Sequence, residues 1–289
     1  MMPKYFDIHS HLQFSGFDED MAEVLGRMRE EGVSTIVVGT EKESSQKACD
    51  MISVDRACLK TSFRLKSEDF ATKAGFQTCS SGIFAAVGLH PNDVLKEEFS
   101  TSFYKSLAQK EGVVAIGECG IDYFRIKNQE LRIRQKKVFE QHVQLAVDLD
   151  LPLMLHCRST SGTTDAYDDA LEILNSYFLI HNSKLRGNAH FFTSSLHIAK
   201  KFLDIGFTIS FPGVITFTSD YDDVVRGLPL ESILSETDCP FAAPVPYRGQ
   251  RNEPVYVKEV VKKIAEIRGE DFEKVREAMI INTRRVFGV

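Results

Sequence analysis

Short apolar runs alternate with longer amphipathic stretches from one end of the chain to the other. Each short run is mostly apolar over four to seven residues, which is typical of strands in a parallel sheet that is covered on both faces. Strands are therefore expected at Tyr5–His9, Thr35–Gly39, Ile83–Leu89, Val113–Glu118, Leu153–His156, Gly187–Phe191, Thr208–Phe211 and Ile233–Thr237.

The longer stretches carry apolar residues with the period of an amphipathic helix. Examples are Asp18–Glu31, Asn128–Leu149, Asp165–Tyr177, Ser194–Leu203, Val255–Ile267 and Phe272–Val286. Asp18 and Ser194 are candidate N-caps, and Gly32 and Gly206 are candidate C-terminal stops.

Eight strand–helix alternations without a linker or repeat predict an α/β protein, a single and possibly distorted (β/α)8 barrel over residues 1–289. A doubly wound open sheet is the structural alternative. In a barrel, the chemistry lies where the strands end, and the Pro-rich loop Pro240–Pro254 overhangs that face. The extended connection at about 53–82 leads from a helix to a strand, so it belongs to the opposite face, as an added helix or a partner surface.

Composition excludes several classes of protein. With 43% hydrophobic and 26% charged residues, the chain is globular, and its net charge of −6 argues against sequence-independent binding to long nucleic acid. No run approaches the roughly 20 apolar residues of a membrane helix, and the N-terminus lacks the apolar stretch of a signal peptide. We therefore expect a cytoplasmic protein without a membrane partner. Six scattered cysteines indicate free thiols and no disulfide-linked partner.

Histidines gather at the predicted C-terminal strand ends. Five of the eight lie there, whereas about one is expected by chance. They are His9, His11, His90, His156 and His190, and Glu118 and Asp238 end two further strands. Residues two apart on a strand share a face, so His9 and His11 can hold one cation, although a lone H-x-H is equally compatible with satisfied polar groups in a loop. His142, His181 and His197 are expected on helices or connections and receive no chemical role.

Four histidines and two carboxylates exceed the first shell of one ion. A nitrogen and oxygen shell that leaves room for water is a catalytic arrangement, and six ligands suit two divalent ions about 3.5–4 Å apart with one bridging carboxylate. Such a pair activates water, so hydrolysis is the expected reaction. Cys119, Cys157 and Cys239 each follow a proposed ligand, and they are therefore expected to face the helix layer as small buried hydrophobes.

Six motifs occur in order along the chain: Asp7–His11, Gly88–Pro91, Gly117–Tyr123, Leu151–Arg158, Glu236–Pro240 and Arg248–Pro254. Together they resemble the TatD family of metal-dependent deoxyribonucleases, within the amidohydrolase-like hydrolase barrels. The resemblance implies hydrolysis of phosphodiester bonds in DNA, typically as an exonuclease, with two divalent ions. It also implies dependence on magnesium or another divalent ion, and a histidine-rich shell would equally accept zinc or manganese, since magnesium prefers oxygen ligands.

The resemblance also implies roles for individual residues. His9 and His11 would bind the first ion with Asp238 beside it, Glu118 would bridge, and His156 with His190 would hold the second ion. Asp238 would take or steer the proton of the nucleophile. His90 would contact the substrate phosphate or protonate the leaving oxygen.

The substrate-binding residues are predicted with alternatives. Arg158, Arg248 and Arg251 are candidates to grip phosphate, although each is equally compatible with a surface salt bridge. Tyr123 and Phe124 would stack on a base or line the floor of the cavity. Asn252 and Glu253 are expected to pin the last loop, and Pro254 to start the next helix.

Two other functions remain open at this point. The first is an amide, lactone or ester hydrolase of the same barrel group, although Glu118 stands where such enzymes often carry a carboxylated lysine. The second is a non-catalytic scaffold that the metal merely stabilises.

Overall fold

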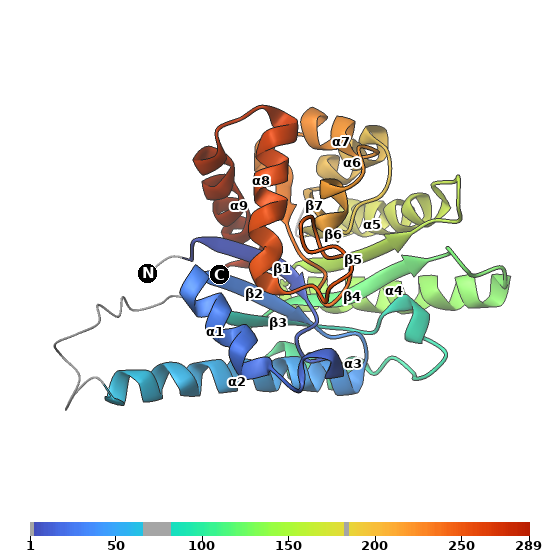
Figure 1. Cartoon of the computed structure of the whole chain (residues 1–289). Helices are drawn as coiled ribbons and strands as arrows, with labels where there is room; N and C mark the ends of the chain where they lie inside the picture. Colours follow the sequence, from blue (N-terminus) through green and yellow to red (C-terminus); the bar gives the residue numbers. More distant parts are fainter. Residues whose placement is uncertain (1–2, 66–81, 182–184) are drawn as a thin grey trace.

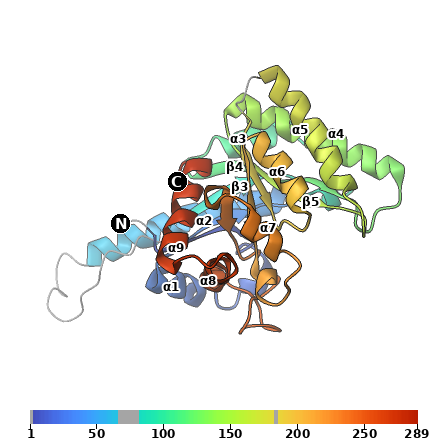
Figure 2. The same ribbon diagram turned by 90° about the horizontal axis from the view of Figure 1, so that it is seen from above.

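The computed structural model describes residues 3–65, 82–181 and 185–289. Within them, eight parallel strands form one sheet in sequential order, with helices outside it (Figures 1 and 2). The strands are β1 (Tyr5–Ser10), β2 (Val33–Val38), β3 (Ile83–Val87), β4 (Val113–Asp122), β5 (Leu153–Arg158), β6 (Gly187–His190), β7 (Phe207–Phe211) and β8 (Ile233–Ser235). The barrel prediction is confirmed, because the strands never reverse their order as a doubly wound sheet requires.

The barrel is nearly closed between β8 and β1. A single parallel bridge links Ser10 to Cys239, and the Asp238 amide donates to the His9 carbonyl over 2.9 Å. The buried Asp7 carboxylate adds a cross-link, since it accepts from both the amide (2.8 Å) and the hydroxyl (2.7 Å) of Thr237. Side-chain hydrogen bonds therefore help to join the two strands that pair least.

Helices cover the outside of the barrel. They are α1 (Met21–Glu31), α2 (Lys42–Leu65), α3 (Thr101–Ala108), α4 (Gln129–Leu149), α5 (Asp165–His181), α6 (Leu196–Asp204), α7 (Asp222–Gly227), α8 (Val257–Arg268) and α9 (Phe272–Phe287). In the part of the chain that the structure describes, none of them is both long and apolar enough to cross a bilayer.

Two helix starts differ from the prediction. Asp18 closes a short 3-10 turn at Ser15–Phe17, so α1 begins only after Asp20. Ser195, not Ser194, caps α6, because its hydroxyl accepts from the Ile198 amide. The predicted stop at Gly32 is confirmed, since Gly32 ends α1 with a φ of 68°, a backbone conformation that glycine adopts without strain.

The long connection at 53–82 begins as a helix. α2 continues to Leu65, and residues 66–81 lie outside the described residues. The first part of this segment thus lengthens α2 and does not form a separate added helix among the described residues, and the role as a partner surface remains a prediction.

Apolar side chains fill both layers of the barrel. Inside it, Phe6, Ile8, Met154 and Leu234 form a cluster that also receives Val286 and Phe287 from α9. Cys119, Cys157 and Cys239 are free and buried among the side chains of the larger cluster, which includes those of the covering helices, as the strand alternation predicted. The apolar filling leaves the carboxyl ends of the strands to polar residues.

Candidate metal centre

The six predicted metal ligands come together at the carboxyl ends of the strands. β1 and the residue after it supply His9 and His11, and β4, β5 and β6 supply one residue each. The loop after β8 supplies Asp238. The whole set is His9, His11, Glu118, His156, His190 and Asp238, and we call it the ligand cluster.

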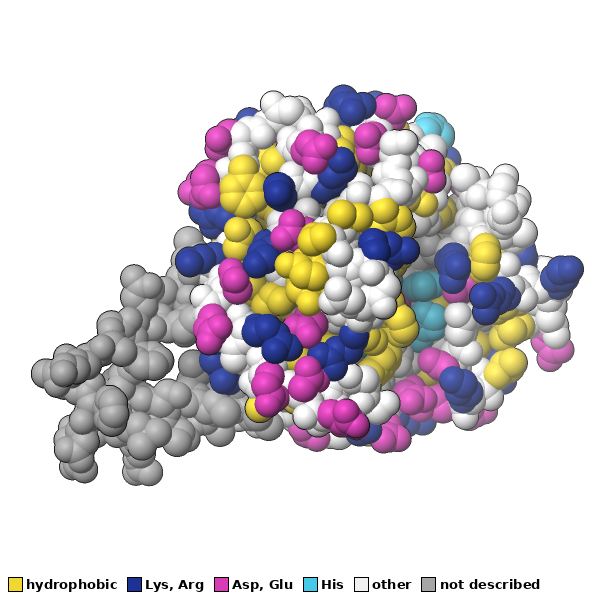
Figure 3. Space-filling view, viewed as in Figure 1, with side chains coloured by type: hydrophobic (Ala, Val, Ile, Leu, Met, Phe, Trp, Pro, Cys, Tyr) yellow, Lys and Arg dark blue, Asp and Glu magenta, His cyan; other side chains and the backbone are white. Residues whose placement is uncertain are grey.

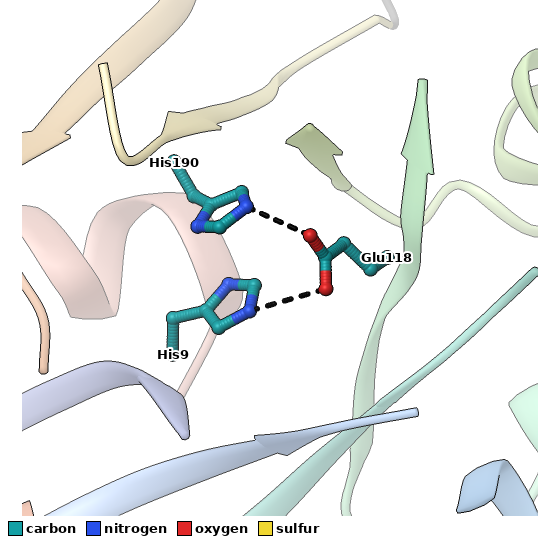
Figure 4. Close-up of side chains that lie close together, drawn as sticks. All are labelled: His9, Glu118 and His190. Carbon is teal, nitrogen blue, oxygen red and sulfur yellow. Dashed lines mark hydrogen bonds and ion pairs between the residues drawn. The ribbon is translucent and has the colours of Figure 1, made fainter. Parts of the chain in front are cut away.

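Glu118 stands between two halves of the ligand cluster. Its Oε2 lies 3.4 Å from His9 Nε2 and 3.6 Å from His11 Nε2. Its Oε1 lies 2.8 Å from both His156 Nδ1 and His190 Nε2. Figure 4 shows the carboxylate with one oxygen turned to His9 and the other to His190. This is the arrangement of a carboxylate that two cations can share.

Asp238 completes the first half. Its Oδ1 lies 3.4 Å from His11 Nε2 and 3.8 Å from His9 Nε2. Its φ of 55° is in the left-handed region, which an aspartate tolerates better than most residues. The hydrogen bond from its amide to His9 holds this backbone in place.

Glycines on β4 allow this strand to approach β5 closely enough to place Glu118. A Cβ on Gly117 would lie 2.5 Å from the Met154 carbonyl oxygen, which is too close for any other residue. The same strand pair needs Gly120, where a Cβ would collide with the His156 carbonyl oxygen. β4 can therefore carry Glu118 beside β5 only with glycines at these positions.

Hydrogen bonds fix which ring nitrogens face the ligand cluster. His11 Nδ1 donates to the Val38 carbonyl over 2.8 Å, so Nε2 presents its lone pair to Glu118 and Asp238. His156 lies between two carboxylates, because its Nε2 is 3.2 Å from Asp122 Oδ2 and its Nδ1 is 2.8 Å from Glu118 Oε1.

The donor set fits a metal ion. Both ring nitrogens of His11 and of His156 face oxygen acceptors, so each ring needs either a second proton or a metal cation between it and the carboxylates. Histidine nitrogens with carboxylate oxygens are the ligands that zinc and manganese share.

The surroundings keep Glu118 charged. Burial by itself raises the pKa of this carboxyl, but the surrounding histidines, His190 above all, bring the pKa well below its usual range. The Asp122 carboxyl is affected in the same way: burial raises its pKa, but the hydrogen bond from His156 and other contacts hold it at about 2. The site therefore offers anionic oxygens to a cation.

His90 lies beside the second half of the ligand cluster. Its Nε2 is 3.5 Å from Glu118 Oε1, and its ring centroid is 4.4 Å from that of His156. Its Nδ1 accepts from the Asn92 amide, so the neutral ring carries its hydrogen on Nε2. Burial lowers the pKa of His90 to about 3, which keeps the ring neutral.

Three buried carboxylates support the ligand cluster, and the sequence analysis gave them no role. Asp122 accepts from His156, Asp7 accepts from the His9 amide, and Glu236 accepts from the Phe191 amide directly after His190. A signal for Asp122 exists in the sequence, since it lies four residues after Glu118 on β4 and even spacings on a strand share one face. Spacing does not place Asp7 and Glu236, because the β1 register is irregular after Asp7 and Glu236 lies beyond the end of β8.

The predicted substrate-binding arginines differ in their surroundings. The Arg251 guanidinium contacts both oxygens of Asp20 at 2.6 Å, Glu253 Oε1 at 3.0 Å and the Gly16 carbonyl. Arg248 stacks 3.7 Å above the Phe217 ring and donates to the Ala243 carbonyl. Arg251 thus forms the salt bridges that were its alternative role.

The two aromatic candidates, Tyr123 and Phe124, differ in their exposure. Tyr123 is 2% exposed, and its hydroxyl donates to Asp169 over 2.7 Å, so we assign it to the core and not to base stacking. The Phe124 ring is 39% exposed, and the Arg158 guanidinium lies 3.9 Å from its centroid.

Comparison with known proteins identifies the relatives of this chain. The model of the family described as TatD related DNase matches residues 6–288. The chain belongs to the TatD family. An uncharacterized metal-dependent hydrolase of Bacillus subtilis strain 168, YabD, is 34% identical over 288 residues, which are 98% of this chain and 99% of YabD. By family, the chain is a metal-dependent hydrolase.

Two further relatives of this TatD-family protein agree with that assignment. The 3'-5' ssDNA/RNA exonuclease TatD of Cronobacter sakazakii is 30% identical over 299 residues, covering 98% of this chain and 97% of the relative. The crystal structure of YjjV, a TatD homologue from Escherichia coli K12, superposes with a TM-score of 0.80 at 27% identity over the full length of both chains. The resemblance in the sequence motifs is therefore confirmed.

Proposed function

We propose that this TatD-family protein hydrolyses phosphodiester bonds of DNA and acts as an exonuclease with two divalent ions. The observation that carries the proposal is the position of Glu118, whose two oxygens face two different groups of ligands. His9, His11 and Asp238 would hold one ion, and His156 and His190 the other. When bound there, divalent cations supply positive charge that stabilises phosphate oxygens and makes water more acidic.

Side chains of the protein would accept the proton of the attacking water and bind the phosphates. Asp238, with 14% of its side chain exposed, is placed to accept the proton of the attacking water. His90 presents an Nε2–H, so it would donate a hydrogen bond to a phosphate oxygen. Arg158 is an exposed cation two residues beyond His156 and would bind a neighbouring phosphate.

Two observations favour a nucleic acid over another phosphodiester. The relative from Cronobacter sakazakii carries the name of an exonuclease on single-stranded DNA and RNA. In addition, exposed phenylalanines that follow the strand ends, Phe124 and Phe241, offer apolar surface to nucleobases.

The test is cleavage of end-labelled oligonucleotides. The protein is stripped with a chelator and reloaded with Mg²⁺, Mn²⁺ or Zn²⁺ in turn, and single- and double-stranded DNA labelled at either end are supplied together with small lactones. We expect stepwise shortening from one end with at least one ion. Glu118→Gln should lower the rate by roughly a thousandfold or more while circular dichroism shows a folded protein.

The matched control is Glu231→Gln, which neutralises an exposed glutamate before β8, at the opposite end of the barrel. Its rate should equal that of the wild type. Turnover of lactones but no cleavage of DNA with any ion would contradict the assignment to phosphodiesters. Full DNA cleavage by Glu118→Gln would contradict the role of the ligand cluster.

A further inference from the structure

We propose that Phe124 and Arg158 form a platform beside the ligand cluster, on which one base of a single-stranded nucleic acid stacks. The inference rests on the proposed function and names the part of the substrate that the protein holds next to the cleaved bond. We call these two side chains the Phe124 platform.

The Phe124 platform is built on two paired strands. Phe124 follows β4 by two residues, and Arg158 is the last residue of β5. Asp122 and Arg158 are register partners, and the Tyr123 amide donates to the Arg158 carbonyl over 2.7 Å. The backbone of both residues is therefore fixed, and the guanidinium lies 3.9 Å from the centroid of a ring that stays 39% exposed.

One carboxylate connects the Phe124 platform to the ligand cluster. Asp122 Oδ1 accepts from the Phe124 amide over 3.0 Å, and its Oδ2 lies 3.2 Å from His156 Nε2. The Asp122 side chain thus positions both the predicted ligand His156 and the backbone amide of Phe124. A base on the platform consequently has its own backbone phosphates next to the metal centre.

The charge of the platform suits a polyanion. Among residues 3–65, 82–181 and 185–289, the Arg158 guanidinium has no carboxylate partner, whereas Arg132 pairs with Asp165. The Arg125 guanidinium lies 5.9 Å from the centroid of the same Phe124 ring. The chain as a whole has a net charge of −6, whereas Arg158 and Arg125 place two positive charges beside the Phe124 ring. Figure 3 shows histidine side chains in a hollow of this face, with hydrophobic side chains and charged side chains of both signs around it.

Stacking on such a platform selects for unpaired bases. An aromatic ring or a guanidinium plane stacks with any base, but a base inside a duplex is already covered by its neighbours. The stacked guanidinium still directs its N–H groups sideways, where they reach phosphate oxygens. The Phe124 platform therefore favours single strands without favouring a sequence.

The experiment distinguishes contacts to the base from contacts to the phosphate. Binding of fluorescein-labelled oligothymidylate and of an abasic oligonucleotide of equal length is measured by fluorescence anisotropy with Ca²⁺ present, and cleavage of both is followed with Mg²⁺ or Mn²⁺. Phe124→Ala should weaken binding of oligothymidylate about tenfold and binding of the abasic strand less than about twofold. Arg158→Ala should weaken both, because it also removes a phosphate contact.

Three further variants control for unrelated effects. Phe124→Leu keeps the apolar bulk but loses the aromatic plane, so it should also weaken binding of oligothymidylate more than binding of the abasic strand. Ile281→Ala removes an exposed apolar side chain from α9, and Arg186→Ala removes a half-buried arginine directly before β6, at the opposite end of the barrel. Both should bind as the wild type does.

The outcomes distinguish the platform from the proposed function. If the wild type cleaves DNA but Phe124→Ala and Phe124→Leu treat both strands as the wild type does, the platform is wrong and the function stands. If Phe124-dependent binding occurs without cleavage under any ion, the platform stands and the function is wrong. If the wild type neither binds nor cleaves, both are wrong.

Discussion

Asp122 determines which nitrogen of His156 faces the ligand cluster. Its carboxylate is buried and lies 3.2 Å from His156 Nε2, and Asn92 donates to the same oxygen over 3.0 Å. A carboxylate behind a ligating histidine fixes the orientation of the ring and raises its basicity. The metal affinity of the site should therefore depend on a residue that is not itself a ligand.

Replacing Asp122 tests this dependence. Asp122→Ala should weaken Zn²⁺ binding by about 10- to 100-fold in competition with a chromophoric chelator, because the His156 ring is free to rotate. Asp223→Ala, which removes a carboxylate that is 96% exposed on α7, should bind Zn²⁺ as the wild type does. Equal affinity of Asp122→Ala and the wild type would contradict the positioning role.

His142 is a buried histidine that lies outside the ligand cluster. It lies buried on α4, where Nε2 accepts from the Leu89 amide over 2.9 Å and Nδ1 donates to the Val138 carbonyl over 2.8 Å. Burial lowers its pKa from 6.5 to about 4. Its expected place on a helix is thus confirmed, and the fold buries it there.

The neutral state of His142 makes stability depend on pH. Its folded pKa lies below the unfolded value, so between these two pH values the unfolded chain binds a proton that the native protein does not. Its contribution is therefore complete above about pH 6.5 and is lost as the pH falls towards 4, by up to about 3 kcal/mol.

Urea unfolding in a chelator, repeated across this pH range, measures the effect. His142→Gln should be less stable at neutral pH but should lose less stability on acidification than the wild type. His197→Gln, on an exposed position of α6, should keep the wild-type dependence. An unchanged pH dependence in His142→Gln would show that other groups cause it.

At the scale of elements, the loop after β8 is held to the barrel by a few polar side chains. Asn252 is fully buried, and its amide group donates to the carbonyls of Thr237 (2.8 Å) and Phe241 (2.6 Å). The predicted pinning role is confirmed for Asn252, and Pro254 begins a 3-10 turn as expected. This loop includes Asp238, so its order supports the ligand cluster.

Asn252→Ala should reduce the free energy of unfolding by about 2 kcal/mol, because it leaves two carbonyl groups without their donor. Chemical denaturation of the metal-free protein measures the change. Gln250→Ala alters an exposed residue of the same loop and should stay within about 0.5 kcal/mol of the wild type. Equal stability of the two variants would mean that Asn252 does not hold the loop.

The elements that the sequence predicted are those with a strong pattern. All eight strands appear because their apolar runs are bounded by polar strand ends, whereas β4 extends four residues beyond the expected end at Glu118. The extension carries Asp122, which explains why a boundary at Glu118 concealed its role. The N-cap of α6 is one residue later than predicted because Ser195 offers the same hydroxyl as Ser194, whereas Asp20 precedes α1 without a side-chain cap bond.

Contacts between distant residues could not be predicted from the pattern. Arg251 and Tyr123 were candidates for substrate binding, but Asp20 from before α1 and Asp169 from α5 engage them in the fold. Only the tertiary structure decides whether an arginine or tyrosine already has a partner. Even spacing on one strand, in contrast, is visible in sequence, and it places Asp122 on the same face of β4 as Glu118.

For the whole molecule, the ligand cluster joins strands that are distant in the chain. β1, β4, β5 and β6 and the loop after β8 each contribute to it, and the barrel pairs β8 with β1 only weakly. A cation bound by His9, His11 and Asp238 would cross this weakest seam. Metal binding should therefore stabilise the global fold.

Thermal unfolding with and without metal measures that stabilisation. A bound ion at a thousandfold excess over its Kd contributes about 4 kcal/mol, which corresponds to a rise in Tm on the order of 10 °C. Glu118→Gln should show a much smaller rise, and Glu231→Gln the full one. The same Tm for the chelated and reloaded wild type would indicate that the barrel does not depend on a metal.

Diffraction from crystals of the metal-loaded protein, recorded on both sides of the absorption edge of the added ion, tests the metal centre most directly. We predict two anomalous peaks about 3.5–4 Å apart on either side of the Glu118 carboxylate, one near His9, His11 and Asp238 and one near His156 and His190. Peaks elsewhere on the protein, or none at the ligand cluster when the ion is in excess, would contradict the account.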